Sequence, residues 1–359
     1  MKKFMTAGLG ALAIATALSG TFASAKELKG SVYLLVPNVS TLRWAKFDIP
    51  NITAALQKEA PGVKLEVLNA NDNMQQQLSQ AESALANGAL GIILVAVDPP
   101  RSAGILAKAD ADGVPVVTYA HDPGAGPVAY HVVVPYSDIG EAQGKLLAEN
   151  LPEHRPVRLA YMLGDPNFSF YSEQMKGWDK NINPLVANGS VEIVCRADAM
   201  FYLPANAQKN MEQCLTKADN KVDAAVIMND DTGGGVVAAL ANQNLTGKVK
   251  LFGGYDATLE GIQRVLAGWQ AADMAPGYKA MANAAVKLLL SKIEGQEPPA
   301  DLVTTRFDNH FVKGGVPTFA GPNVFITADN VQTTVVDEGL FTKAEICTGI
   351  AVGSAFCKK

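Results

Sequence analysis

The chain has 359 residues, of which 48% are hydrophobic and 18% are charged, and this composition excludes a disordered or collagen-like chain. Its formal net charge of −5 argues against nucleic acid as a partner, because nucleic-acid binding needs a clustered positive surface. The length is sufficient for two hydrophobic cores.

The first 25 residues are typical of a secretory signal. Lys2 and Lys3 precede an apolar run, which ends in an Ala-Ser-Ala segment at Ala25. We expect cleavage after Ala25, which removes two lysines and no acid and takes the formal net charge from −5 to −7. No cysteine follows that bond, and no later apolar run reaches the roughly 18 residues of a membrane span. The sequence therefore predicts a soluble, exported protein without a lipid anchor.

Short β-branched or aliphatic segments alternate along the chain with segments of helical spacing. We predict strands at residues 31–37, 64–71, 91–97, 115–121, 158–164, 191–197, 224–230 and 250–256. Helices are indicated between them by faces such as Met74, Leu78, Ala81 and Leu85. Because the strand segments are almost continuously apolar, they are typical of parallel strands that helices cover on both faces. The pattern predicts a doubly wound α/β fold.

The strands are more numerous than one such sheet usually holds, and the pattern restarts within residues 129–154. We therefore predict two Rossmann-like lobes. The first comprises residues 26–136 and about 275–305, and the second comprises residues 137–274 and about 306–359. Three passages between the lobes would make a three-segment hinge. His131 falls within a strand and is expected to be a packed core histidine.

All four cysteines, Cys195, Cys214, Cys347 and Cys357, lie in the segment expected to be exported, where disulfides can form. Three pairings are possible. We favour Cys195 with Cys214 and Cys347 with Cys357, because each bond closes a short loop, and reduced buried thiols are the alternative. None of the cysteines has zinc-ligand or C-x-x-C spacing.

Two aspartates follow predicted strands at positions that should face a cleft. In a doubly wound fold, ligands bind outside the carboxyl ends of the strands, where helix N-termini and free backbone N–H groups point. Asp256 ends the segment "KLFGGYD", and Asp98 opens "DPPRSAG" after another strand. Both are candidate ligand-binding residues, and for both the alternative is a helix N-cap.

Several motifs together indicate a family. They are "STLRWAKFD" after the first strand, "VPVVTYAHD" at the fourth, "VIMNDDTGGG", "GYDATLEGIQRVLAGWQ" and "EGQEPPAD". With them the chain resembles the periplasmic sugar-binding proteins of ABC importers, of the ribose- and xylose-binding type and most closely the xylose-binding branch. The resemblance covers nearly all of residues 26–359. It implies a type I periplasmic binding protein, a monomer whose two lobes close around a monosaccharide or polyol and deliver it to an ABC permease of the inner membrane.

The resemblance implies ligand-binding roles for Arg43, Trp44, Tyr202, Asn229 and Asp256. These residue types suit a sugar, whose ring has apolar C–H faces and a rim of hydroxyls. Aromatic rings can stack on the faces, and charged groups can make the stronger kind of hydrogen bond with the hydroxyls. Structural alternatives stay open: a core position for Trp44, a surface ion pair for Arg43 and an Asx-type cap for Asn229.

The chain departs from the family at three places, which leaves the substrate open, and at one of them Pro276, with Asp273 and Met274 nearby, stands where the family usually carries an amide or amine side chain. An Asp-Arg pair that is usual in the family is replaced by Ala120 and His121, followed by Asp122. In "GDPNFSFYSEQ", aromatic and hydroxyl residues that include Phe168 and Ser169 replace the usual polar ligands. We include His121, Asp122, Phe168 and Ser169 in the predicted site, which has lost polar contacts and gained aromatic area. A different pentose or hexose, a deoxy or methylated sugar, and a polyol all remain open.

No other chemistry is favoured by the sequence. The four histidines lack metal-binding spacing, the glycine run 233–235 fits neither phosphate-binding motif, and no nucleophile elbow is present. We therefore expect no metal, no cofactor and no enzymatic activity, for which His121 beside Asp122 is the only candidate base. The alternative functions are a sugar receptor for a membrane chemosensor or sensor kinase, and a binder of a non-sugar ligand such as a nucleoside.

Overall fold

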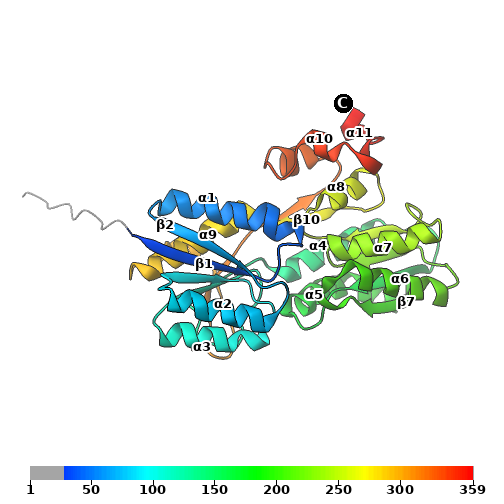
Figure 1. Cartoon of the computed structure of the whole chain (residues 1–359). Helices are drawn as coiled ribbons and strands as arrows, with labels where there is room; N and C mark the ends of the chain where they lie inside the picture. Colours follow the sequence, from blue (N-terminus) through cyan, green and yellow to red (C-terminus); the bar gives the residue numbers. More distant parts are fainter. Residues whose placement is uncertain (1–27, 359) are drawn as a thin grey trace, which may run out of the picture.

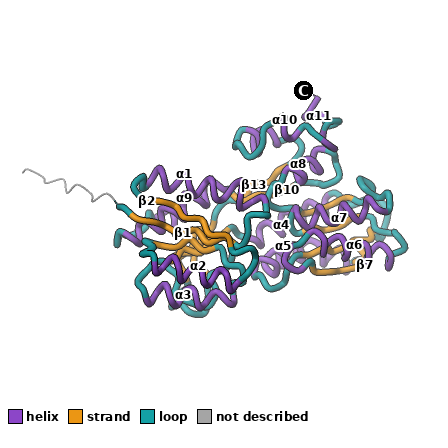
Figure 2. The backbone as a smooth tube through the Cα atoms, in the orientation of Figure 1, coloured by secondary structure: helices purple, strands orange, loops and turns teal. Residues whose placement is uncertain are grey.

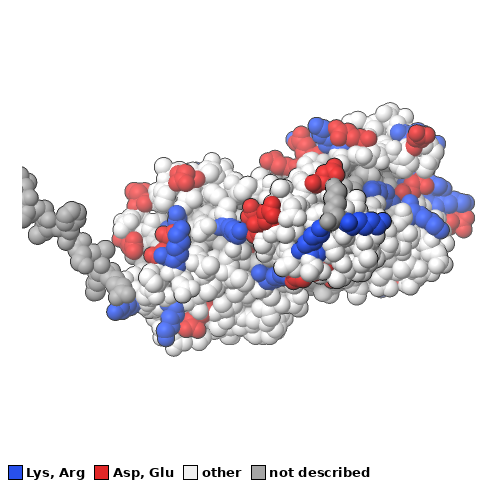
Figure 3. Space-filling view, turned by 90° about the horizontal axis from the view of Figure 1, so that it is seen from above, with Lys and Arg blue, Asp and Glu red and all other residues white. Residues whose placement is uncertain are grey.

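Residues 28–358 are described by a computed structural model, in which two α/β lobes lie next to each other, left and right in Figure 1. The predicted secretory signal lies outside the described residues. In each lobe helices enclose a sheet, which Figure 2 draws as orange strands among purple helices. None of the helices in residues 28–358 is long and apolar enough to cross a membrane. On the face drawn in Figure 3, basic and acidic side chains are interspersed.

The first lobe contains a seven-stranded sheet in the order β11-β12-β5-β4-β3-β1-β2. Its strands are β1 (Gly30–Val36), β2 (Val63–Asn69), β3 (Gly91–Leu94), β4 (Val116–Tyr119), β5 (Tyr130–Val133), β11 (Thr305–Phe307) and β12 (Val316–Ala320). Every neighbouring pair is parallel except β11 with β12.

Side chains of this sheet alternate between two cores, as a pleated strand requires. Val32 and Leu34 of β1 pack in one core with α1 and α9, and Leu35 packs in the other core with α2 and α3. The helices are α1 (Ile49–Glu59), α2 (Met74–Ala86), α3 (Ala103–Ala111) and α9 (Tyr278–Ile293). The continuous apolar runs in the sequence reflect this burial on both faces.

The second lobe has a four-stranded parallel sheet in the order β7-β6-β8-β9. Its elements are β6 (Val157–Leu163), β7 (Val191–Asp198), β8 (Ala224–Ile227), β9 (Lys250–Gly253), α4 (Tyr136–Glu149), α5 (Ser169–Ala187), α6 (Pro204–Lys217), α7 (Asp230–Asn242) and α8 (Leu259–Leu266). Tyr161 of β6 packs with Trp178 of α5, and Met162 packs on the opposite face with Met211 of α6. This lobe is therefore also doubly wound.

All eight predicted strands form, although several end earlier than predicted. The residues beyond the shortened strands, such as His121, Asn229 and Asp256, lie in loops or caps at the carboxyl edge of the sheets. His131 is fully buried in β5, where its Nδ1 lies 2.9 Å from the Thr118 hydroxyl, so its predicted core position is confirmed.

The predicted division of the lobes was wrong for β11 and β12. β12 pairs in parallel with β5, with Thr318 opposite His131, so the first sheet continues to Ala320. β11 is only three residues long, and β12 contains a proline and a threonine, which leaves little strand signal in "TRF" and "VPTFA". Their place is decided by pairing with a strand nearly two hundred residues earlier, which no local pattern records.

Three segments join the lobes and lie against one another. The first follows β5, the second contains β10 (Asp273–Pro276), and the third connects β12 to β13 (Asn323–Ile326). β10 and β13 form a separate antiparallel pair. Gly277 N donates to Pro322 O at 2.8 Å, and Gly321 N donates to Val133 O at 2.7 Å. Backbone hydrogen bonds therefore connect all three segments, and the predicted three-segment hinge is confirmed.

The C-terminal residues form a cap that contacts both lobes, at the top of Figure 1. Phe341 and Ile346 pack in one cluster with Phe47 of the first lobe and Ile262 of α8 in the second lobe. Gln263 Nε2 of α8 donates to the Thr348 hydroxyl at 2.9 Å. The cap includes the short helices α10 (Lys343–Ile346) and α11 (Ala355–Lys358).

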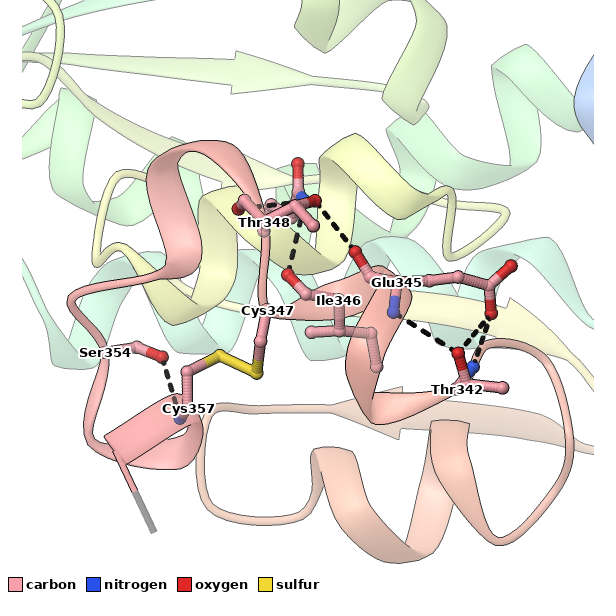
Figure 4. The surroundings of a disulfide bond; sticks show 8 residues. Thr342, Glu345, Ile346, Cys347, Thr348, Ser354 and Cys357 are labelled. Carbon is pink, nitrogen blue, oxygen red and sulfur yellow. Dashed lines mark hydrogen bonds between the residues drawn. A yellow bond between two sulfur atoms is a disulfide. The ribbon is translucent and has the colours of Figure 1, made fainter.

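Both favoured disulfide pairings are present. Cys347 and Cys357 close the cap beyond α10, whose start is fixed by reciprocal hydrogen bonds between Thr342 and Glu345 (Figure 4). Cys195 of β7 is bonded to Cys214 of α6, which ties a helix to the edge of the second sheet.

Candidate ligand-binding cleft

A cavity of about 330 Å³ lies between the lobes. Its walls come from the loops after β1, β2, β3 and β4 in the first lobe, and from the start of α5 and the loops after β7, β8 and β9 in the second. The predicted site residues that line it are Arg43, Trp44, His121, Phe168, Tyr202, Asn229 and Asp256. The cavity therefore lies at the carboxyl ends of the strands, where a doubly wound fold binds its ligands.

Arg43 and Asp256 form an ion pair between the two lobes. Arg43 begins η1 (Arg43–Asp48), a π-helical turn of the first lobe, and Asp256 follows β9 in the second. Arg43 Nη1 lies 3.3 Å from Asp256 Oδ1, and Arg43 Nε donates to Asp48 Oδ2 at 2.9 Å. The Arg43 side chain is only 6% exposed, so the alternative of a surface ion pair is wrong. Its buried Nη2 has no hydrogen-bond partner among the described residues.

The backbone at Asp256 is held in an unusual conformation. The φ angles of Asp256 and Ala257 are 92° and 47°, in the region that non-glycine residues adopt at a cost of about 1–3 kcal/mol. The Tyr278 hydroxyl donates to Asp256 O at 2.8 Å and supports this turn. The N-cap of α8 is Thr258, whose hydroxyl accepts from Gly261 N, so the cap alternative for Asp256 is wrong. Strained backbone of this kind gathers at binding and catalytic sites.

Two carboxyl groups of the cavity titrate near neutral pH. Burial raises the pKa of Asp256 to about 7, an effect that Arg43 opposes and that Asp230, Asp231 and Asp48 reinforce. Asp231 lines the same cavity, and burial together with the neighbouring Asp230 raises its pKa to about 6. Both carboxyl groups are therefore poorly solvated and would gain from hydrogen-bond donors on a ligand.

Six rings form a connected aromatic row along the cavity wall. Neighbouring centroids are 4.9 to 6.1 Å apart. The rings belong to Trp44, His121, Tyr136, Phe168, Phe170 and Tyr202. The row crosses between the lobes where His121 meets Phe168, at 5.0 Å. Trp44 also packs in the first-lobe core. It therefore has the core position that was its structural alternative and lines the cavity as well.

His121 and Asp122 are engaged separately. His121 Nδ1 donates to Ala96 O at 2.6 Å, because a carbonyl can only accept, and burial lowers the pKa of His121 to about 4. Asp122 Oδ2 accepts from Ser169 N at 3.3 Å, a contact between the lobes. Neither Asp122 nor Ser169 lines the cavity. His121 and Asp122 therefore do not form the acid–base pair that an enzyme would need. Asp122 and Ser169 instead form a contact between the lobes beside the cavity.

Asn229 combines its two predicted roles, whereas Asp98 lies outside the site. Asn229 Oδ1 accepts from Thr232 N at 3.1 Å and caps α7, while the residue also lines the cavity. Asp98 does not line the cavity, and its Oδ1 accepts from Arg101 N at 3.1 Å at the start of the following helical turn. The structure therefore does not bring Asp98 together with the other predicted residues, and its carboxylate serves the local turn.

Other residues of the cavity were not predicted. Tyr136, Phe170, Asp231 and Tyr255 line it. Tyr255 and Asp231 stand one and two positions from predicted residues, so widening each motif by two residues would have found them. Phe170 could have been found as an aromatic residue of "GDPNFSFYSEQ", the motif that departs from the family. Tyr136 lies in the first hinge segment, and no sequence motif marks it as a site residue.

Comparison with known proteins places the chain in a family. A family model for the periplasmic binding protein domain matches residues 32–297. The chain therefore belongs to the periplasmic binding protein domain family, and the resemblance drawn from its motifs is confirmed. The predicted fold class is confirmed as well.

Individual relatives align with most of the chain. It is 29% identical over 329 residues to the D-xylose-binding periplasmic protein of Escherichia coli (strain K12), covering 92% of this chain and 96% of that protein. It is 24% identical over 356 residues to the multiple sugar-binding periplasmic protein SbpA of Azospirillum brasilense, covering 94% and 96%. A solved structure of an ABC transporter solute binding protein from Clostridium phytofermentans, with bound β-D-glucose, has a TM-score of 0.78 at 23% identity, covering 88% of this chain and 99% of that one. This last similarity shows a shared fold.

Proposed function

We propose that the chain is an exported solute-binding protein that captures a monosaccharide or related polyol between its lobes and delivers it to an ABC permease. The observation that carries the proposal is the Arg43–Asp256 pair, because its partners come from opposite lobes and line one cavity. A ligand that hydrogen-bonds to both residues would hold the lobes together. Sugar-binding relatives that align with most of the chain support this class of ligand.

The mechanism is closure about the three-segment hinge. Contacts that a ligand makes with both lobes favour the closed arrangement by their differential affinity. Arg43 Nη2 would donate to one hydroxyl and Asp256 would accept from another, with charge-assisted bonds. Trp44 from the first lobe and Tyr202 from the second would pack against C–H faces of the ligand.

The protein would act as a monomer in the periplasm, after cleavage following Ala25. Periplasmic relatives support the location. No reaction is proposed for the bound ligand, because burial lowers the pKa of His121 to about 4 and makes it a weak base, while Asp122 accepts from Ser169 N and does not line the cavity.

Calorimetric titration of residues 26–359, refolded to remove carried-over ligand, tests the proposal. The panel contains pentoses, hexoses, deoxy sugars and polyols. We expect one member to bind with micromolar or tighter affinity and to be recovered chemically unchanged. If the folded protein binds no member of the panel, the sugar assignment is overturned, and nucleosides and other non-sugar ligands should be tested next.

Affinity for the sugar found in that titration is expected to rise with pH and to level off above about pH 7. Ionised Asp256 is the form that accepts hydrogen bonds from hydroxyls, and burial raises its pKa to about 7. Binding should therefore weaken by about tenfold for each pH unit below that value. Asp231, with a pKa of about 6, adds to this slope at lower pH. Titrations from about pH 5 to pH 8 measure the effect.

Stability without ligand should respond to pH in the opposite direction. Folding raises the pKa of Asp256 above its ordinary value of 3.8, so protonation favours the folded chain. This contribution is present in acid and is lost as pH rises through about 7. Asp256→Asn removes the titrating group and should flatten both curves. Equal slopes in the variant and the natural protein would contradict the assignment.

A further inference from the structure

Three of the charged residues that line the cavity, Arg43, Asp231 and Asp256, lie together, while a fourth, Asp72, accepts from Asn38 Nδ2 at 2.8 Å. Arg43 Nη1 lies 3.3 Å from Asp256 Oδ1, and Asp231 is close enough to Asp256 to raise its pKa. Asp231 follows β8 and Asp256 follows β9, which are neighbouring strands of the second sheet. A ligand can therefore be anchored by its hydroxyls at this charged group, which offers one donor and two acceptors with charge-assisted strength.

The aromatic row meets the charged group at two rings. The Arg43 guanidinium lies over the Trp44 ring, with 4.6 Å between Cζ and the centroid, and Tyr136 is close enough to Arg43 and Asp256 for their charges to act on the pKa of its hydroxyl, while its ring stacks on Phe170 at 4.9 Å. From Trp44 the row continues through His121 to Phe168, Phe170 and Tyr202. Among the described residues no Lys or Arg lies over the ring of Phe168 or Phe170, and the nearby Asp122 carboxylate accepts from Ser169 N between them.

The polar groups along the row are mostly engaged within the protein. His121 Nδ1 donates to Ala96 O, and the Tyr202 hydroxyl lies 3.8 Å from Met228 Sδ. Gln174 lines the cavity, but its Nε2 donates to Gln143 Oε1 at 2.8 Å and to Met228 O at 3.3 Å. Asn229 Oδ1 is used to cap α7. A ligand hydroxyl that faces Phe168 and Phe170 would lose its bonds to water and find few partners.

We propose that the ligand is a sugar with one edge free of hydroxyls, a deoxy or O-methylated sugar, whose hydroxylated edge binds at Arg43, Asp231 and Asp256 and whose apolar edge lies against Phe168 and Phe170. The proposal rests on the proposed function and narrows its substrate class. A methyl or methylene group against these rings exchanges water for favourable apolar contact. A hydroxyl at the same place is buried without a matching donor or acceptor.

Calorimetric titration with matched pairs of sugars tests the proposal. Each pair has one stereochemistry and differs by one hydroxyl: L-fucose with L-galactose, L-rhamnose with L-mannose, 2-deoxy-D-ribose with D-ribose, and methyl β-D-xyloside with D-xylose. The first three pairs test a missing hydroxyl and the last tests a methylated one. We expect the deoxy or methylated member of at least one pair to bind about tenfold or more tightly than its parent.

Two outcomes overturn the inference in distinguishable ways. If every pair that binds prefers the hydroxylated parent or shows no preference, the inference fails and the sugar-binding function stands. If no member of this or the wider sugar panel binds to the folded protein, the proposed function fails and the inference fails with it.

Variants at Phe168 separate apolar contact from folding. Phe168→Leu keeps an apolar side chain and should keep the preference for the deoxy or methylated sugar. Phe168→Asn supplies hydrogen-bonding groups and should lower that preference at least about fivefold, in the direction of the parent sugar. Phe311→Asn is the matched control, because Phe311 is 59% exposed and does not line this cavity. An unchanged preference in Phe168→Asn, with the protein folded, would refute a role for this ring in selection.

Discussion

Asp256→Ala is expected to weaken sugar binding by about 2–5 kcal/mol, because the ligand hydroxyls and the Arg43 guanidinium both lose the carboxylate that accepts their hydrogen bonds. This corresponds to a loss of affinity between about thirtyfold and more than a thousandfold. Folding should be largely kept, since Arg43 retains its bond to Asp48 Oδ2 and the buried Asp256 carboxylate is itself poorly solvated. Calorimetric titration and urea denaturation measure the two effects separately.

Two further variants make this result interpretable. Alanine at a φ of 92° carries a backbone cost, whereas asparagine tolerates positive φ more readily, so Asp256→Asn tests the charge with less strain. Asp98→Ala is the matched control, because Asp98 is also an aspartate after a strand but does not line the cavity. Its sugar affinity should equal that of the natural protein. Unchanged affinity in Asp256→Ala would remove Asp256 from the site and with it the observation on which the proposed function depends.

Most of the strands could be predicted because they are buried on both faces and read as apolar runs, as in "SVYLLVP" over β1, although the edge strands β2 and β7 are largely exposed. The disulfide Cys347–Cys357 could be predicted because it is local in sequence. β11 and β12 could not be assigned to their lobe, since their pairing with β5 is a contact between distant segments and the strands themselves are partly exposed. Local burial leaves a pattern in the sequence, whereas the choice of a distant partner does not.

The residues of the site could likewise be predicted from local features, whereas their contacts across the cavity could not. Asp256 could be expected at a cleft from its place at a strand end, but its pairing with Arg43 joins residues 213 positions apart, and only the family resemblance brought them together beforehand. The same strand-end reasoning selected Asp98, whose carboxylate serves a turn instead. The position of an acid after a strand therefore identifies candidates, and the contact across the cavity decides between them.

Arg43→Met is expected to lower both stability and sugar affinity, because it leaves two buried carboxyl groups without their positively charged partner. Asp48 accepts hydrogen bonds from Arg43 Nε and from the Tyr119 hydroxyl, and Asp256 faces Arg43 Nη1. Removing one partner of such a buried pair costs about 3–5 kcal/mol of folding free energy. Arg101→Met is the control, since the Arg101 side chain is 67% exposed and its pair with Asp98 should contribute less than about 1 kcal/mol.

The stability lost in Arg43→Met should depend on pH with a defined sign. Without the guanidinium, the pKa values of Asp48 and Asp256 rise further, because burial already raises both and Arg43 is the charge that opposes it. The carboxyl groups can then be buried in neutral form as pH falls, so the difference in unfolding free energy from the natural protein should shrink between about pH 7 and pH 5. Urea denaturation at the two pH values measures it.

The double variant Arg43→Met/Asp48→Asn separates the two roles of Arg43. Asp48 does not line the cavity, so neutralising it should restore much of the stability at neutral pH while sugar affinity stays low. Affinity should stay low because the unpartnered Arg43 Nη2, the buried donor available to a ligand, is still missing. Recovery of binding together with stability would instead mean that Arg43 only supports the fold around η1 and makes no contact with the sugar.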